Sequence, residues 1–300
     1  MKNRLTQLFL TLCLLSSQAM ATISVQDDAG KTVTLQKPAQ RVVTLAPHVT
    51  ELVFAAGGGK RIVGTVSYSD FPAAAKSIPQ IGDNRQIDME RVIALKPDLI
   101  VVWLHGSAER QIDQLRALGI PLFYSEPHKL DEIADNILRI GKLLGTDQTA
   151  QAAAAELRQK LTKLKTQYQS RPPVRMFYQV WDKPLYTLNG QHILSDAMRL
   201  CGGENIFANM TVTAPNVSIE AVLQENPEAI FSGDQRNQRT QPSGGGVTLW
   251  QRYSTMTAVR RGNLFSLDGD LLSRAGPRMI DGAAALCEKL ELARQHRKIQ

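Results

Sequence analysis

The sequence has few cysteines, and it lacks a second long apolar run and any complete catalytic motif. Three cysteines occur in 300 residues, and beyond the N-terminal segment no apolar run approaches the length of a membrane-spanning helix. The glycine-rich stretch 57–61 ends in Lys60-Arg61, whereas a P-loop requires Ser or Thr after the lysine. No Gly-x-Ser-x-Gly or His-Glu-x-x-His pattern occurs. A content of 43% hydrophobic and 21% charged residues fits a globular protein.

The excess of basic residues does not form a patch typical of nucleic-acid binding. The net charge is +7, and the positive side chains are scattered along the chain. Proteins that bind nucleic acids usually cluster such charges on one face or helix. We therefore expect no nucleic-acid partner.

The five histidines leave one enzymatic alternative open. His48, His105 and His128 follow predicted strands of the first half of the chain, and ligands bind at such strand ends. An exported metal-dependent enzyme that uses these histidines is therefore an alternative hypothesis. Our preferred interpretation contains no catalytic residues and no metal site.

Residues 1–21 have the pattern of a secretory signal. Lys2 and Arg4 precede a short apolar run at 8–15, and Ala19-Met20-Ala21 has the small-x-small form of a cleavage site. We expect cleavage between Ala21 and Thr22. Loss of the segment lowers the net charge to +5 because two basic residues leave with it.

Two cysteines, Cys201 and Cys287, remain after this cleavage. An even pair in an exported protein favours a disulfide, and two buried free thiols are the alternative.

The stretch 146–168 predicts a long helix near the middle of the chain. It contains no Gly or Pro, and Leu157, Leu161, Leu164 and Tyr168 form one apolar stripe. About 23 residues give a rod of roughly 35 Å. Because it separates two stretches that each alternate strand and helix, we interpret it as a stiff connector between two lobes.

Both flanking stretches predict parallel sheets covered by helices on both sides. The fold class is therefore α/β, with two Rossmann-like lobes joined by one long rigid helix. The predicted limits are 22–145 for the first lobe, 146–170 for the linking helix and 171–300 for the second lobe. We expect 22–38 to be a polar lead and 235–246 to be a loop. The predicted strands are 41–46, 61–66, 99–103, 120–125, 174–180, 229–232 and 264–267, and the predicted helices are 47–56, 88–95, 107–118, 130–144, 193–200, 218–224, 248–257 and 277–297.

One unit occurs once in each half. Residues 88–100 align without gaps on 218–230, and both copies read as a helix cap, a Glu two places later, an apolar pair, a Pro and a strand. Glu90 and Glu220 fall at equivalent places. A single Glu in a first helical turn is explained by the helix dipole. A matched pair also suits a partner that is itself twofold symmetric.

Aromatic and polar residues after the predicted strands suggest a ligand cleft between the lobes. Aromatic side chains that line a cleft together with a few polar groups are suited to a flat or bulky organic ligand. Asp270 and Arg274 could instead pair with each other. The candidate ligand-binding residues are His48, Tyr68, Trp103, Trp181, Tyr186, Asp270 and Arg274.

Several blocks resemble the periplasmic cobalamin-binding proteins of vitamin-uptake ABC importers. They lie at 41–57, 67–72, 88–99, 200–207 and 273–278, and the resemblance covers nearly the whole mature chain. The early blocks are shared with siderophore- and haem-binding relatives. The block Cys-Gly-Gly-Glu-Asn-Ile-Phe at 201–207, together with Cys287, is typical of the cobalamin branch.

The resemblance implies a class III periplasmic binding protein fold with little hinge motion and a location in the periplasm. It implies that Tyr68, Trp103, Tyr186, Asp270 and Arg274 line the pocket. It further implies that Cys201 and Cys287 form the family disulfide, and that Glu90 and Glu220 dock onto arginines of the two membrane subunits. We expect a monomer that binds cobalamin or a related corrinoid, needs no cofactor and delivers its ligand to a permease dimer.

Two departures from the family pattern affect the ligand. Tryptophans of better-known members are replaced near Asn84 and Ala214, and Tyr186 replaces another aromatic residue. An incomplete corrinoid, a different corrinoid base, haem or a ferric siderophore therefore remain alternative ligands.

Overall fold

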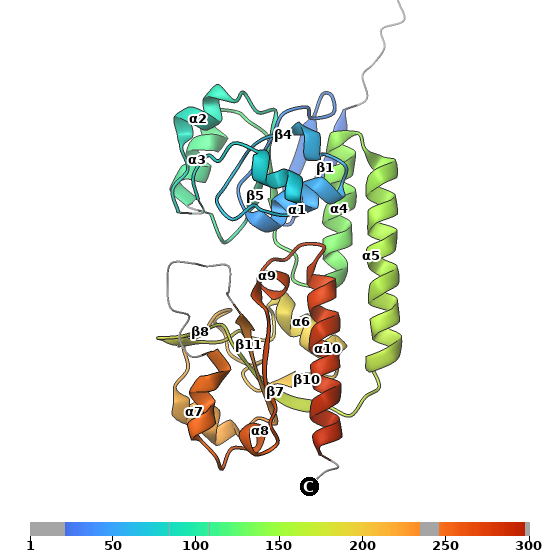
Figure 1. The fold of residues 1–300 in the computed structure, drawn as a ribbon. Helices are drawn as coiled ribbons and strands as arrows, with labels where there is room; N and C mark the ends of the chain where they lie inside the picture. The colour runs from blue at the N-terminus through green and yellow to red at the C-terminus, as the bar shows by residue number, and fades with distance from the viewer. Residues whose placement is uncertain (1–21, 84, 108, 235–245, 298–300) are drawn as a thin grey trace, which may run out of the picture.

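The computed structural model describes residues 22–83, 85–107, 109–234 and 246–297. Two α/β lobes lie end to end, and long helices run along one side of both (Figure 1). The predicted signal segment and most of the predicted loop 235–246 lie outside the described residues, as does Asn84. No helix within the described ranges combines the length and apolar character needed to cross a membrane.

The two lobes contain sheets of the same topology. Each has four strands, all neighbouring pairs are parallel, and the first strand in the chain lies between the second and the third. This equivalence supports the repeat read from the sequence. The first sheet has the order β4-β3-β5-β6 and consists of β3 (Val42–Thr44), β4 (Ile62–Thr65), β5 (Leu99–Trp103) and β6 (Leu122–Ser125). The second has the order β10-β7-β11-β12 and consists of β7 (Val174–Gln179), β10 (Gly203–Asn205), β11 (Ala229–Asp234) and β12 (Leu264–Asp268).

Helices cover the sheets, and most of their ends match sequence signals. Pro47 opens α1, where its missing N–H costs nothing, and Gly145 ends α4 in the left-handed conformation. In the first lobe the helices are α1 (Pro47–Ala55), α2 (Met89–Ala94), α3 (Glu109–Ala117) and α4 (Leu130–Leu144). In the second they are α6 (Ile193–Leu200), α7 (Ile219–Glu225), α8 (Thr257–Arg260), α9 (Gly269–Leu272) and α10 (Met279–His296).

The linking helix α5 (Asp147–Tyr168) has the predicted position and apolar stripe. Leu157, Leu161 and Tyr168 are buried, and Leu164 packs partly buried against the same cluster. Thr146, just before α5, donates its hydroxyl to the carbonyl oxygen of Ala56 at 2.5 Å, which fixes the start of α5 to the end of α1. The helix lies beside α4 in the first lobe and runs on past α10 in the second (Figure 1).

One hydrophobic cluster extends through both lobes. It includes Val53 of α1, Ile137 of α4, Leu161 of α5 and Leu286 of α10. Separate clusters lie on the opposite faces of the two sheets, under α2 and α3 in the first lobe and under α7 and α8 in the second. Because the shared cluster is continuous, the linking helix packs against both lobes over its length rather than crossing solvent between them.

The predicted polar lead at 22–38 is wrong. This segment forms an antiparallel hairpin of β1 (Ile23–Gln26) and β2 (Thr32–Leu35), with Gly30 in the turn at a φ of 73°. Val25 and Leu35 are buried in the shared cluster against α4. The short alternation of apolar and polar residues is stabilised only because a helix surface is available to cover it.

The predicted helix at 248–257 is also corrected. The chain forms a 3-10 helix, η3 (Gly246–Arg252), and then the single turn α8. Trp250 is fully buried, and its indole nitrogen donates to Oε1 of Gln179 at 2.7 Å. This anchoring of one large side chain determines the local backbone. The hairpin of β8 (Trp181–Asp182) and β9 (Leu185–Tyr186), the edge strand β10, the helix α9 and the 3-10 helices η1 (Gly59–Arg61) and η2 (Ala73–Ser77) were not predicted either.

The disulfide between Cys201 and Cys287 is confirmed. It joins the end of α6 to α10, with an S–S distance of 2.01 Å, and both residues are completely buried. The bond closes a loop with a sequence separation of 86 residues inside the second lobe.

Candidate functional site

Three candidate ligand residues follow adjacent strands of the first sheet. His48 lies on α1 just after β3, Tyr68 follows β4, and Trp103 ends β5. Carboxyl ends of parallel strands lie at one edge of a sheet, which is where α/β proteins bind ligands. The structure brings His48 and Trp103 into edge-to-face contact, with ring centroids 5.4 Å apart.

His48 is a buried histidine with an unused nitrogen. Its relative exposure is 5%, and Nε2 has no hydrogen-bond partner among the described residues. Burial, with a further contribution from the charge of Arg274, lowers the pKa of His48 to about 4, although Asp28 acts in the opposite direction. The imidazole is therefore neutral at pH 7, and its Nε2 is a buried polar atom without a partner in the described structure.

Trp103 owes its position to a close approach of the following loop. A Cβ at Gly106 would lie 1.8 Å from an atom of the Trp103 ring, so only glycine fits there. The ring is half-buried between this backbone and His48. It therefore has one packed side and one side that remains accessible.

Tyr68 is held in an unusual backbone conformation and is 62% exposed. Its φ of 65° lies in the left-handed region, which costs a non-glycine residue about 1–2 kcal/mol. The neighbouring Ser69 is buried, and its hydroxyl lies 3.2 Å from that of Thr50. Thr50 in turn contacts the hydroxyls of Thr44 and Thr65 at 2.7 and 2.9 Å. This buried hydroxyl cluster ties the loop to α1 and the sheet, and the sequence reasoning missed it.

The second lobe supplies a pair of aromatic residues from one hairpin. Trp181 and Tyr186 are register partners across β8 and β9, and both are half-buried. The Trp181 indole nitrogen donates to the carbonyl oxygen of Lys183 at 3.1 Å. The backbone N–H of Val180 donates to the carbonyl oxygen of Tyr186 at 2.9 Å. The hairpin therefore fixes both rings next to the carboxyl end of β7.

Asp270 and Arg274 do pair with each other, but Arg274 has further partners. Its Nη2 donates to Asp270 at 3.3 Å, and its Nη1 donates to Asp70 at 2.7 Å and to Glu51 at 3.4 Å. The last two residues belong to the first lobe. Arg274 thus joins the first-lobe and second-lobe groups of candidate residues, and Glu51, Asp70 and Arg278 are additional residues of this region that the sequence reasoning missed.

Glu90 and Glu220 are both exposed, and their surroundings are equivalent. Asp88 caps α2 by accepting the N–H of Arg91 at 3.0 Å, and Ser218 caps α7 by accepting the N–H of Ala221 at 3.1 Å. Each glutamate is the second residue of its helix. In Figure 1, α2 and α7 lie near opposite ends of the molecule, on the side away from α5.

The histidines of the first lobe do not assemble into a metal centre in the described structure. Within the ranges that the structure describes, no group of three or more His, Cys, Asp or Glu residues could hold a metal ion. His105 lies 3.4 Å from Glu126 and is largely exposed, whereas His48 is buried against Trp103.

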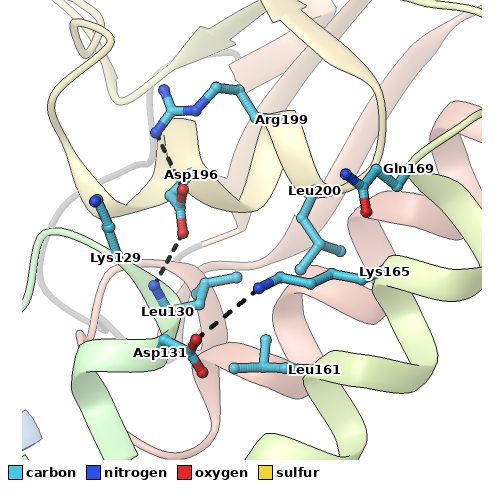
Figure 2. A pocket seen from close by; sticks show the side chains of 9 residues that line it. All are labelled: Lys129, Leu130, Asp131, Leu161, Lys165, Gln169, Asp196, Arg199 and Leu200. Carbon is cyan, nitrogen blue, oxygen red and sulfur yellow. Dashed lines mark hydrogen bonds and ion pairs between the residues drawn. The ribbon is translucent and has the colours of Figure 1, made fainter. Parts of the chain in front are cut away.

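A cavity of about 360 Å³ lies elsewhere, where α4, α5 and α6 meet (Figure 2). Asp196 of α6 accepts the backbone N–H of Leu130 at 3.0 Å and the guanidinium Nη2 of Arg199 at 3.1 Å. Lys165 lies 3.9 Å from Asp131. Asp131, Lys165, Asp196 and Arg199 of the lining therefore already have partners. None of the candidate ligand residues lines this cavity, which consists of Lys129, Leu130, Asp131, Leu161, Lys165, Gln169, Asp196, Arg199 and Leu200.

Two lobes with equivalent parallel sheets, a linking helix and candidate residues at the facing strand ends define a two-lobed α/β solute-binding protein. The chain belongs to the periplasmic binding protein family, whose model matches residues 42–271. This membership agrees with the fold class predicted from the sequence. The exact limits of the lobes stay a prediction.

Among curated proteins, the chain is similar to the vitamin B12-binding proteins of Vibrio cholerae and Yersinia pestis. Identity with the first is 38% over 258 residues, covering 86% of this chain and 91% of the relative. Identity with the second is 36% over 252 residues, covering 84% and 86%.

Solved structures give a consistent result. The chain matches the crystal structure of the periplasmic vitamin B12 binding protein BtuF of Vibrio cholerae with a TM-score of 0.78 and 38% identity, covering 86% of this chain and 98% of the other. A periplasmic haem-binding protein from Pseudomonas aeruginosa matches with a TM-score of 0.69 and 26% identity, covering 83% and 91%.

Proposed function

We propose that this chain captures cobalamin or a related corrinoid between its lobes and delivers it to an ABC importer of the inner membrane. The observation that carries the proposal is the 38% identity, over 86% of this chain, to a protein described as vitamin B12-binding. A similarity of this extent includes both lobes and the linking helix, and therefore the whole framework that positions a ligand.

The candidate site has the chemical character that a corrinoid requires. Tyr68 is exposed and Trp103 is half-buried on one side, and Trp181 and Tyr186 are half-buried on the other. Such rings offer flat apolar surface with a polar end, which suits a broad macrocycle carrying amide groups. His48 and Asp270 add polar groups, so we assign ligand contacts to these residues and to the edge of Arg274 that remains exposed.

We further propose that Glu90 and Glu220 contact basic residues of a permease dimer. Their equivalent positions on α2 and α7 and their exposure support this role. An exposed carboxylate is suited to a charge-assisted hydrogen bond with an arginine of a partner.

We expect the protein to bind and release its ligand without catalysing a reaction, and to act as a monomer in the periplasm. We expect the signal to be removed during export by cleavage near Ala21 and Thr22. Mass spectrometry of the protein isolated from the periplasm tests this site directly. A mature chain that begins at another residue would contradict the cleavage proposal.

Parallel titrations with cyanocobalamin and haemin test the choice of ligand. Trp fluorescence and the visible spectrum follow both, because three tryptophans are present and both ligands absorb visible light. We expect saturable one-to-one binding of cyanocobalamin. Saturable binding of haemin alone would reject the corrinoid proposal and favour the alternative suggested by the haem-binding relative at 26% identity. Stoichiometric zinc or iron together with turnover would favour the enzymatic alternative.

A further inference from the structure

The boundary between the lobes contains an ion network centred on two arginines of the second lobe. Arg274 donates to Asp70 at 2.7 Å and to Glu51 at 3.4 Å across the boundary, and to Asp270 of its own lobe at 3.3 Å. Its side chain is 10% exposed. Arg274 comes just after α9 and Glu51 lies on α1, and Figure 1 shows α9 on the side of its lobe that faces α1.

Arg278 binds the same first-lobe glutamate with better geometry. Its Nε donates to Oε2 of Glu51 at 3.1 Å, and its Nη2 donates to Oε1 at 2.6 Å. This two-point arrangement is the strongest form of an arginine–carboxylate pair. The guanidinium also lies over the ring of Phe71, 4.1 Å from the ring centroid, so a second first-lobe residue holds it.

The backbone between the two arginines is fitted to α1. A Cβ at Gly276 would lie 3.3 Å from Oε2 of Glu51 and 3.5 Å from the carbonyl oxygen of His48, so the turn packs closely against α1. The segment 273–278, noted above as a family-like block, is therefore one of the surfaces by which the second lobe contacts the first.

Glu51 makes this contact costly to break. Its side chain is 2% exposed, and both of its arginine partners come from the other lobe. The pair is shielded from water, so loss of one partner leaves the other charge poorly compensated. Separation of the lobes at this edge would remove both arginines from Glu51 together.

The same network reaches the loop that presents Tyr68. Asp70, whose N–H donates to the Tyr68 carbonyl oxygen at 3.0 Å, is tethered to Arg274 across the boundary. Within the first lobe, the buried Ser69 anchors the loop to Thr50. The left-handed conformation of Tyr68 persists only where its surroundings enforce it. One of its two anchors is thus supplied by the opposite lobe.

We propose that Glu51, Asp70, Arg274 and Arg278 form an inter-lobe latch, and that Glu51 is the positioning residue of this latch. The latch holds the lobes in one relative orientation before ligand arrives and keeps Tyr68 at the edge of the binding region. Its effect on ligand release rests on the proposed function, whereas its effect on lobe orientation does not.

Distance measurements between spin labels test the latch in the protein without ligand. Labels at Lys76→Cys and Gln224→Cys place one exposed probe on each lobe, and the native cysteines are occupied by the disulfide. We expect a narrow distance distribution in the otherwise unchanged protein and a broader or shifted one with Glu51→Gln. Asp70→Asn, at a side chain that is 42% exposed, provides a milder variant if Glu51→Gln folds poorly.

Glu228→Gln is the matched control. Glu228 is also held by two arginines, Arg261 at 2.8 Å and Arg297 at 2.6 Å, but all three residues belong to the second lobe. We expect this variant to keep the original distance distribution. A distribution that stays unchanged in both Glu51→Gln and Asp70→Asn would overturn the latch, and so would equal broadening in the control.

Ligand release gives an independent readout of the positioning role. We expect Glu51→Gln to release cyanocobalamin about tenfold faster, equivalent to about 1.4 kcal/mol, while Glu228→Gln leaves the rate unchanged. An unchanged rate in Glu51→Gln would overturn the link to Tyr68. If the unaltered protein bound no cyanocobalamin, the proposed function would fail, and the spin-label distances would still decide whether the latch exists.

Discussion

Glu90 and Glu220 occupy the same place in two copies of one structural unit. Each is the second residue of a short helix whose capping side chain comes two residues earlier, and each helix leads into the third strand of its sheet. The equivalence extends from local sequence to strand order. It therefore reflects two related lobes rather than a coincidence of helix-dipole complementarity.

Replacement of both glutamates by alanine tests their proposed docking role. We expect Glu90→Ala with Glu220→Ala to leave the ligand dissociation constant unchanged and to reduce stimulation of the importer's ATPase activity strongly, because two exposed charges are lost far from the candidate ligand residues. Glu109→Ala is a suitable control, since Glu109 is also exposed in the first turn of a helix but has no counterpart in the other lobe. Full stimulation by the double variant would reject the docking role.

Removal of one aromatic wall should weaken ligand binding. We expect Tyr68→Ala or Trp103→Ala to weaken the binding free energy of cyanocobalamin by about 1–3 kcal/mol, because stacking and apolar contact are lost. The dissociation constant rises accordingly. Isothermal titration measures the change. Tyr253→Ala is the control, because Tyr253 packs against Trp250, with ring centroids 6.0 Å apart, outside the candidate site. A dissociation constant unaltered by both substitutions would mean that these rings serve packing alone.

One buried and one half-buried histidine, His48 and His192, should make the protein less stable as the pH falls. Burial lowers the pKa of His48 and of His192 to about 4, and Arg274 and His128 respectively contribute further. His192 also accepts the N–H of Leu194 at Nδ1 (3.1 Å), which requires that nitrogen to be unprotonated. Between pH 6.5 and about 4 the unfolded chain therefore binds protons that the native protein does not.

The free energy of unfolding should consequently fall as pH falls through this window, by up to about 1.4 kcal/mol per pH unit for each histidine. Above pH 6.5 both states are neutral at these residues, and the effect disappears. Urea unfolding from pH 7.5 to pH 4.5 measures the slope. His48→Gln should make the free energy of unfolding depend less steeply on pH than in the unaltered protein. Equal slopes in the two proteins would contradict this account.

Loss of the disulfide should destabilise the second lobe. A bond across 86 residues restricts the unfolded chain by about 3–5 kcal/mol in the loop-entropy model. We expect the Cys201→Ser, Cys287→Ser variant to lose a free energy of unfolding of this size and therefore to unfold at a lower urea concentration. Reduction of the unaltered protein should have a similar effect, and a midpoint insensitive to both treatments would show that the bond adds little.

Local sequence signals determined much of the secondary structure. Apolar periodicity together with Pro and Gly boundaries predicted α4, α5 and α6 and the core strand β5 closely, because each of these elements buries a continuous face of its own. The repeat predicted the equivalence of the lobes, and the two cysteines predicted their bond. Short elements such as β1, β2 and β10 escaped prediction because partners distant in sequence stabilise them.

The candidate ligand residues could be named from the sequence and its resemblance to a family. Their burial, their hydrogen-bond partners and the pKa of His48 could not. Only the tertiary structure placed Arg274 against Glu51, which lies 223 residues away in sequence, and buried His48 beside it. Periodicity and capping act over a few residues and are therefore written in the local sequence. Burial, the pKa of a histidine and the partners of a charge depend on which surfaces of the two lobes come together, and that is decided only when the lobes pack.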